Sequence, residues 1–263
     1  MRFSSSSSLL LALLGSSAPA LVPAARIWSS DGSRASWDDS YIDAGTAGKV
    51  TEVDNVYYGT APALKMEQRY QASYGGLYHA EVHHYEGYKR GDKLSYGFEF
   101  RLQSDWDFTP GVSFNLAQFI ADFTDLGCEE TWMPSTMVYL YGNQLTTRVK
   151  YGNVCPTDQQ KITTFGNLAT VTAGVWHKVV LEVSWKSDGT GTFNLWFDGR
   201  QAAGMPKTGI PTTVTQAREF QFRVGLYANG WKKGMSVAQP FRQVWFDRIA
   251  IGDAPADVDP DNW

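Results

Sequence analysis

Apolar side chains alternate with polar ones over much of this chain, and this period of two constrains the fold more than any other feature. In the segment 93–102, apolar residues occupy every second position from Leu94 to Leu102, with polar or small residues between them. The same period recurs in 177–185, 193–197, 220–227 and 244–251, with a change of phase near Asp247. Such alternation is typical of strands that bury one face. The sequence therefore predicts an all-β fold, a β-jelly roll in which two antiparallel sheets pack as a sandwich.

Length and composition bound the kind of protein. The chain has 263 residues, 43% of them hydrophobic, which suits one large domain that we place at 26–263. Its 14 Phe, 13 Tyr and 10 Trp suggest stacking surfaces on a β scaffold. The formal net charge of −4 argues against general affinity for nucleic acid or anionic lipid, because both need a basic surface. It still allows an anionic ligand in a local basic cleft.

The first 25 residues are predicted to be a secretory signal peptide. Arg2 precedes a short apolar run from Leu9 to Leu14, and small residues suited to cleavage follow, as far as Ala25. No stretch approaches the ~20 apolar residues that a transmembrane helix needs. We therefore expect a secreted, extracellular protein without a membrane anchor.

The chain has two cysteines, Cys128 and Cys155. In an exported protein two cysteines most simply form one disulfide. Closing a loop of roughly 25 residues would contribute about 3 kcal/mol to stability. The spacing fits neither a CxxC redox motif nor a Cys/His zinc motif.

Three of the four histidines fall within 79–84. At strand spacing His79, Glu81 and His83 point to the same side, and three titratable groups on one face are costly to bury in a core. They suit the polar floor of a cleft that binds a charged ligand, a plain solvated face, or a zinc site.

A second polar face lies in 221–227. Gln221, Arg223 and Tyr227 share it, with Gly225 leaving space between the last two. A cation and a phenol over a gap suit an anionic substrate, although an ordinary exposed strand face fits the pattern equally well.

Four further side chains have two interpretations each. Gln118 falls on the apolar face of 112–120, as either a hydrogen-bonded core amide or a group facing a cleft. Arg148 and Lys150 extend a basic cleft or are simply solvated. Asp247 is a calcium ligand or a surface acid.

Several enzyme classes lack their motifs. No nucleophile elbow, phosphate-binding loop or dinucleotide fingerprint is present. Glu52 and Asp54 are not followed by the further acid that many jelly-roll glycoside hydrolases carry, and retaining hydrolysis needs two carboxylates.

Taken together, the motifs resemble a known family. Jelly-roll polysaccharide lyases have rear strands that look like three parts of this chain, the run 176–178, Trp185 and the run 191–199. Their cleft motifs fall where this chain has the segments 78–84, 118–120 and 222–227. From about residue 27 to 253 the chain is most similar to the fungal β-1,4-glucuronan lyases, and more distantly to alginate lyases. The resemblance implies a concanavalin-like jelly roll that cleaves a polyuronate by β-elimination, with a structural calcium ion.

The chain departs from the alginate lyase motifs at defined positions. His79 and His83 stand where those enzymes have two arginines around the residue matching Glu81, and Ile120 replaces a histidine two positions after Gln118. In the third motif Arg223, Gly225 and Tyr227 match, while Ala228 departs and Asn229 follows one place late. The missing histidine shifts the expected chemistry to Tyr227 and the two histidines.

The resemblance suggests a role for each candidate residue. Gln118 with His83 or His79 would bind the substrate carboxylate, Arg223 would assist electrostatically, and Tyr227 would act as both base and acid, with its pKa lowered by adjacent cations. Residues expected to bind flanking sugars are Arg148, Lys150, Asn229 and Trp231. We expect a monomer that cuts glucuronan internally. Alternatives are an alginate or other polyuronate lyase, or a non-catalytic lectin-like jelly roll.

Overall fold

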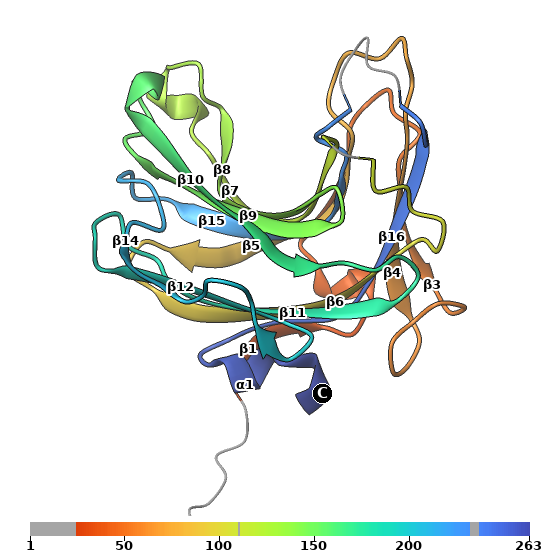
Figure 1. Ribbon diagram of the computed structural model, residues 1–263. Helices are drawn as coiled ribbons and strands as arrows, with labels where there is room; N and C mark the ends of the chain where they lie inside the picture. The colour runs from red at the N-terminus through yellow and green to blue at the C-terminus, as the bar shows by residue number, and fades with distance from the viewer. Residues whose placement is uncertain (1–24, 110, 232–236) are drawn as a thin grey trace, which may run out of the picture.

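The computed structural model describes residues 25–109, 111–231 and 237–263, so the expected signal peptide lies outside the described residues except for Ala25. The described chain folds into two antiparallel sheets packed face to face (Figure 1). This confirms the predicted all-β jelly-roll sandwich. No helix in the described ranges is long and apolar enough to cross a membrane.

One sheet, here called the groove sheet, has seven strands in the order β10-β9-β8-β7-β15-β5-β2. The strands of the groove sheet are β2 (Asp39–Ile42), β5 (His79–Lys89), β7 (Ser113–Asp122), β8 (Trp132–Tyr141), β9 (Gln144–Gly152), β10 (Gln160–Thr170) and β15 (Glu219–Tyr227).

The other sheet, here called the back sheet, is nine-stranded within the described residues and has the central order β13-β12-β11-β6-β16-β4-β3; β1 pairs with β16, and β14 with β12. The strands of the back sheet are β1 (Arg26–Ser30), β3 (Lys49–Val53), β4 (Ala63–Arg69), β6 (Lys93–Leu102), β11 (Trp176–Ser184), β12 (Gly191–Phe197), β13 (Arg200–Gln201), β14 (Lys207–Ile210) and β16 (Phe241–Gly252).

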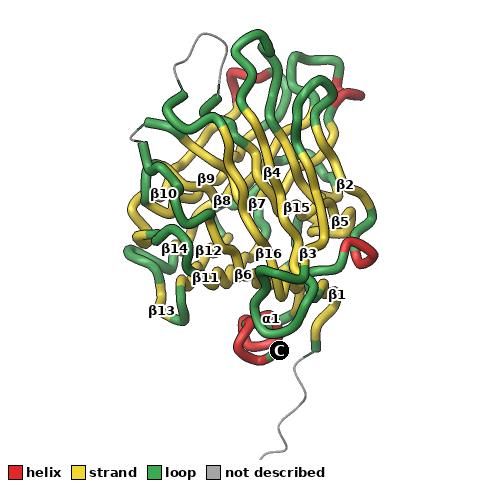
Figure 2. The backbone as a smooth tube through the Cα atoms, turned by 90° about the vertical axis from the view of Figure 1, so that its right-hand side faces the viewer, coloured by secondary structure: helices red, strands yellow, loops and turns green. Residues whose placement is uncertain are grey.

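Helices are short. The α-helix α1 (Pro255–Val258) and the C-terminus lie beside β1, on the side of the back sheet away from the groove sheet (Figure 1 and Figure 2). The 3-10 helices are η1 (Arg34–Ser36), η2 (Thr124–Leu126), η3 (Thr157–Gln159) and η4 (Pro260–Asn262).

Much of the aromatic excess fills the space between the sheets. Tyr88 stacks on Trp185 with ring centroids 3.7 Å apart, and Trp185 donates its Nε1 hydrogen to the Tyr96 hydroxyl at 3.0 Å. Phe119 and Phe222 from the groove sheet complete this cluster. Alternating strands thus place one set of side chains in a continuous core and leave the other set on the outer faces.

The disulfide between Cys128 and Cys155 is confirmed, with Cα atoms 6.0 Å apart. It joins the segment between β7 and β8 to the segment between β9 and β10. His177 lies in β11, where its Nδ1 is 2.8 Å from Asp198 Oδ2 and its Nε2 accepts the Thr172 amide hydrogen at 3.0 Å. Those contacts hold the His177 ring in a structural role away from the groove.

Candidate active site

A groove of about 1030 Å³ crosses the outer face of the groove sheet. It is centred where β15 lies between β5 and β7, because the register pairs Tyr227 with His79, and Arg223 with both His83 and Gln118. The groove is lined by Asp39, Tyr41, Asp43, Leu77, His79, His83, Tyr85, Ser113, Gln118, Ile120, Glu130, Thr131, Trp132, Pro134, Met137, Tyr139, Tyr141, Arg148, Lys150, Gln221, Arg223, Tyr227 and Asn229.

The floor of the groove contains a buried carboxylate, Glu81, that holds two neighbours. Gln118 donates from Nε2 to both carboxylate oxygens, at 2.9 and 2.8 Å, and Arg223 Nη1 lies 4.0 Å from one of them. Gly225 allows this close packing, since a Cβ there would lie 2.4 Å from the Ala80 carbonyl oxygen and 2.6 Å from the Glu81 Cα. Gln118 therefore combines both interpretations, as a hydrogen-bonded buried amide that also lines the groove.

Strict alternation would have placed Gln118 on the same face as Phe114 and Leu116. The pairing of β7 with β8 shifts register between Asn115 and Ala117, and Phe114 and Leu116 both pack in the core. A β-bulge of this kind changes which face the following residues occupy. That shift brings Gln118 to the groove.

Arg223 is fixed by its own strand. The Gln221 side-chain oxygen accepts hydrogens from Nε at 2.9 Å and Nη2 at 2.6 Å, and the guanidinium lies 4.9 Å from the Trp132 ring centroid. Burial lowers the pKa of Arg223, while the Glu81 charge opposes this shift. The result is an oriented cation on the groove floor.

His79 is anchored by a carboxylate that the sequence argument missed. Asp43 Oδ2 accepts the His79 amide hydrogen at 2.6 Å and lies 2.7 Å from its Nδ1, and Tyr41 donates to Asp43 Oδ1 at 3.0 Å. Burial opposes the ionisation of Asp43, but the bonds from His79 hold its pKa below the ordinary value. The missed signal was the pairing of β2 with β5, which joins residues 36 positions apart.

His83 differs from His79. Burial, followed by the positive charges of Arg223 and His79, lowers the pKa of His83 to about 3. Its Nε2 is buried with no hydrogen-bond partner among the described residues. His83 is therefore a neutral imidazole with an unused polar atom at the groove.

Tyr227 stacks on His79, with ring centroids 3.7 Å apart and an interplanar angle of 26°. Burial, then the charges of Glu81 and Asp43, raise the pKa of Tyr227 to about 12, and Arg148 only partly offsets this. This finding is opposite to the expectation that neighbouring cations lower that pKa. Tyr227 is a neutral phenol at ordinary pH.

The candidates for flanking subsites divide into two groups. Arg148 contacts the Met137 sulfur through Nε and Nη2, at 3.1 and 2.8 Å, and Lys150 Nζ is 3.1 Å from Glu130 Oε2. Both cations and Asn229 line the groove.

Trp231 lies elsewhere. It is 3% exposed and packs edge-on against Tyr78 and Phe114 in the core. Trp231 is not among the described residues that line the groove.

The zinc hypothesis for the floor finds little support. Within the described ranges no three or more His, Cys, Asp or Glu side chains gather as a metal site. His79 is bonded to Asp43, and Glu81 to Gln118.

Asp247 is buried in β16 and is not a surface acid. Its oxygens accept amide hydrogens from Tyr58 at 2.7 Å and Arg248 at 2.8 Å, and burial raises its pKa to about 6. A carboxylate oxygen has a second lone pair, so Asp247 can still serve as one calcium ligand. Alone it does not make a site, and no catalytic step is assigned to a metal.

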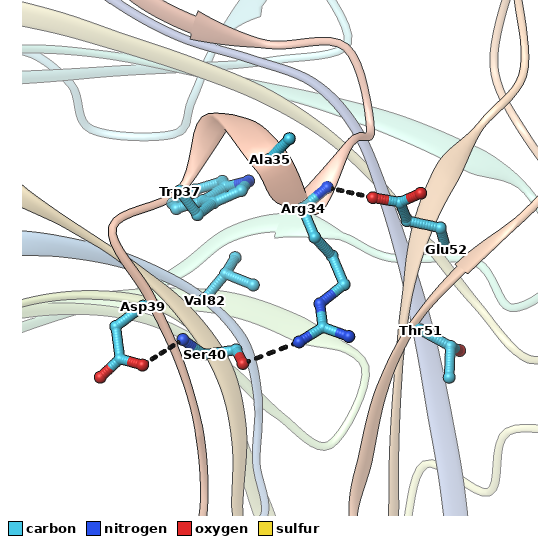
Figure 3. Close-up of a pocket in the computed structure, with 8 residues that line it drawn as sticks. All are labelled: Arg34, Ala35, Trp37, Asp39, Ser40, Thr51, Glu52 and Val82. Carbon is cyan, nitrogen blue, oxygen red and sulfur yellow. Dashed lines mark hydrogen bonds between the residues drawn. The ribbon is translucent and has the colours of Figure 1, made fainter.

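A second hollow of about 630 Å³ opens between β2 and β3 (Figure 3). Arg34 spans it, with its amide donating to Glu52 Oε1 at 2.5 Å and its Nη2 to Ser40 Oγ at 3.1 Å. None of the described residues that line this hollow is a histidine or tyrosine, so it lacks the imidazole and phenol groups that the groove contains.

The comparisons with known proteins agree with this geometry. A family model described as polysaccharide lyase matches residues 29–250. The endo-β-1,4-glucuronan lyase of the fungus Trichoderma reesei is 47% identical, aligned over 90% of this chain and 99% of that one, with a TM-score of 0.84. No curated protein sequence matches.

Two remoter structures share the fold alone. The cellulose-induced protein Cip1 is 18% identical over 86% of this chain and 97% of its own, with a TM-score of 0.52. The marine alginate lyase of Aplysia kurodai is 11% identical over 87% of this chain and 99% of its own, with a TM-score of 0.57.

Proposed function

The chain belongs to the polysaccharide lyase family, and on that premise we propose that it cleaves β-1,4-linked polyglucuronate, glucuronan, internally by β-elimination. The observation that carries the proposal is one groove in which carboxylate-binding donors lie beside a stacked tyrosine–histidine pair. The 47% identity to the Trichoderma reesei enzyme supports the choice of polymer.

The difficult step is removal of the C5 proton, which is very weakly acidic beside an ionised carboxylate. Donors aimed at that carboxylate stabilise the enolate-like species as negative charge develops. We assign this role to Gln118 and the neutral His83, whose buried Nε2 has no hydrogen-bond partner among the described residues. Arg223, oriented by Gln221, supplies positive charge from the groove floor.

The elimination is balanced by two proton movements. A base takes the C5 proton, that electron pair forms the C4–C5 double bond, the C4–O bond breaks, and the leaving oxygen receives a proton. In glucuronate the C5 hydrogen and the C4 oxygen lie on the same side of the ring, so one compact acid–base centre can serve both. Tyr227, a neutral phenol stacked on His79, suits the proton donor.

The rims of the groove suit a chain of sugars. Trp132 is 45% exposed and Tyr141 is 54% exposed, and both line the groove from opposite ends of β8. Arg148, Lys150 and Asn229 would bind flanking uronates. A groove that receives a polymer along its length favours internal cutting.

Three further features belong to the same proposal. Residues 1–25 direct secretion, the enzyme acts as a monomer, and a calcium ion bound in part by Asp247 has a structural role.

The deciding experiment offers the purified enzyme glucuronan, alginate, pectate and heparin, and follows the ultraviolet absorbance of the unsaturated product. Strong activity on glucuronan with little on the others supports the proposal. Preference for alginate would change the substrate. Binding of glucuronan without any absorbance change would indicate a lectin-like protein and overturn the enzymatic assignment.

A further inference from the structure

The contact between Asp43 and His79 joins the residue directly after β2 to the first residue of β5, at the edge of the groove sheet. One oxygen of Asp43, Oδ2, accepts the backbone amide hydrogen of His79 at 2.6 Å and lies 2.7 Å from the ring Nδ1 of the same residue. The His79 carbonyl accepts a hydrogen from Gln68 Nε2 at 2.7 Å, so the backbone at this position is held on both sides. Both Asp43 and His79 line the groove.

Two other histidines contact an aspartate in a similar way. His84 Nδ1 lies 3.0 Å from Asp38 Oδ2, and His177 Nδ1 lies 2.8 Å from Asp198 Oδ2. Neither pair lines the groove, so a histidine–aspartate contact is not by itself a sign of catalysis. What distinguishes His79 is its stack on Tyr227.

We propose that Asp43 is a positioning residue for the elimination, which fixes the Nδ1–H tautomer of His79 and holds the imidazole against Tyr227 so that His79 Nε2 accepts the C5 proton. This inference rests on the proposed function and adds a division of labour to it. A carboxylate can only accept hydrogen bonds, so the nitrogen that it contacts carries the hydrogen and Nε2 keeps its lone pair.

This division of roles between His79 and Tyr227 follows from the protonation states of the groups in the groove. Tyr227 holds its proton at ordinary pH and can give it to the leaving oxygen, but it cannot readily take one. His83 is kept neutral by burial and by Arg223, so it is a poor base that suits hydrogen bonding to the carboxylate. Of the three groups His79 alone has a carboxylate partner that favours the protonated imidazolium formed after proton transfer.

Several titratable groups face the His79 ring. Tyr41 approaches from β2, Asp43 from the residue directly after β2, and Tyr227 from β15, while His83 shares the same face of β5 as His79. Replacing the Asp43 carboxylate with an amide removes the one negative charge bonded to the ring. Asp43→Asn should therefore lower kcat, because the positive charge that forms on the imidazole after proton transfer loses its partner.

The test compares Asp43→Asn, Asp43→Ala, His79→Ala and the Asp43→Ala/His79→Ala double variant on glucuronan. We expect Asp43→Ala to lower kcat about 10- to 100-fold with KM changed less than about threefold. The double variant should be no slower than His79→Ala, because Asp43 acts through that ring. Asp38→Ala, which breaks the pair with His84 away from the groove, is the matched control and should keep the wild-type kcat.

A second readout does not depend on turnover. In protein with ¹⁵N-labelled histidine, the His79 signals, identified by their loss in His79→Ala, should show hydrogen on Nδ1 and none on Nε2. Asp43→Ala should give a mixture of tautomers, and this arm remains informative if the variant is otherwise folded but inactive.

Three results would overturn the inference: an unchanged kcat in Asp43→Ala, an unchanged kcat in Asp43→Asn, or an Nε2–H tautomer in the wild type. Its failure is separable from that of the proposed function. A wild-type enzyme without product on any polyuronate removes the proposed function, whereas an active wild type with an indifferent Asp43 removes only this inference.

Discussion

Individual side chains at the groove are set by neighbours from several strands. Tyr227 receives the negative charges of Glu81 from β5 and of Asp43, which directly follows β2, in addition to burial. Arg148 on β9 opposes them, but weakly. The protonation state of Tyr227 is thus a property of the assembled sheet, and it favours proton donation.

Replacing Tyr227 with Phe removes the proton donor but keeps the ring that stacks on His79. We expect turnover of glucuronan to fall about 100-fold or more while binding of the polymer changes little. Absorbance kinetics and calorimetric binding measure the two effects. Tyr57→Phe, a change at an exposed tyrosine outside the groove, is the control. Near-normal turnover in Tyr227→Phe would remove Tyr227 from the mechanism.

His83 predicts a dependence of stability on pH. Its pKa is about 3 in the folded protein and 6.5 in the unfolded chain, so only the unfolded chain takes up the proton between those values. Stability is therefore complete above about pH 6.5 and falls as pH decreases, by up to about 1.4 kcal/mol per pH unit.

The measurement is the unfolding free energy of wild type and His83→Gln from pH 8 to pH 4.5. The difference between the two should be constant from pH 8 to 7. Below about pH 6.5 the wild type should lose stability faster than the variant. Parallel curves across the whole range would show that His83 is not held neutral.

At the scale of elements, irregularities in the strands position the site. The register shift in β7 turns Gln118 to the groove, and a shift in the pairing of β16 with β6 follows Asp247. The disulfide fixes the segments at one rim, where Glu130 bonds both Lys150 and Gln160. The disulfide thus fixes the rim of the groove, whereas the register shift in β7 positions Gln118 on its floor.

Removing the disulfide tests the rim. The Cys128→Ser/Cys155→Ser variant should lose about 3 kcal/mol of stability, because a closed loop with a sequence separation of 27 constrains the unfolded chain. Denaturant titration measures the loss. Reductant should destabilise the wild type similarly and leave the variant unaffected. An equal response of both proteins to reductant would contradict this account.

Calcium removal tests the proposed structural ion. Asp247 connects β16 to the segment before β4 through the Tyr58 amide, so an ion held there would stabilise both. A chelator should lower the melting temperature by several degrees, and added calcium should restore it. Asp247→Asn should weaken this response. A melting temperature indifferent to chelator and calcium would remove calcium from the proposal.

For the molecule as a whole, the net charge of −4 coexists with cations in the groove. The acids Asp39, Asp43 and Glu130 line the groove beside these cations. Asp43 is paired with His79, and Glu130 with Lys150. Attraction for a polyuronate is therefore local rather than a property of the entire surface.

Neutralising two groove cations tests this. Arg148→Gln/Lys150→Gln should raise KM for glucuronan about tenfold with a smaller effect on kcat, and should reduce the salt dependence of KM. Lys49→Gln/Lys161→Gln makes the same change in charge at exposed residues outside the groove and should leave KM unchanged. Equal effects of the two double variants would mean that only overall charge matters.

Predictions from the sequence succeeded where the cause is local. The alternation of apolar and polar residues predicted a strand over 93–102, which is β6, and the change of phase near Asp247 coincides with a register shift. Both could be predicted because the period of a strand depends on adjacent residues alone. The same period correctly placed His79 and His83 on one face. The disulfide followed from having two cysteines in a chain that was expected to be exported.

The sequence by itself therefore determined the all-β class, the disulfide and the central polar residues of the groove, among them His79, Gln118 and Tyr227. Only the tertiary structure decided that Asp43 holds His79, that Trp231 belongs to the core, and that Tyr227 keeps its proton. Each of these depends on strands that meet across long stretches of chain. Burial and electrostatic interaction sum over all neighbours in space, and no local pattern contains that sum.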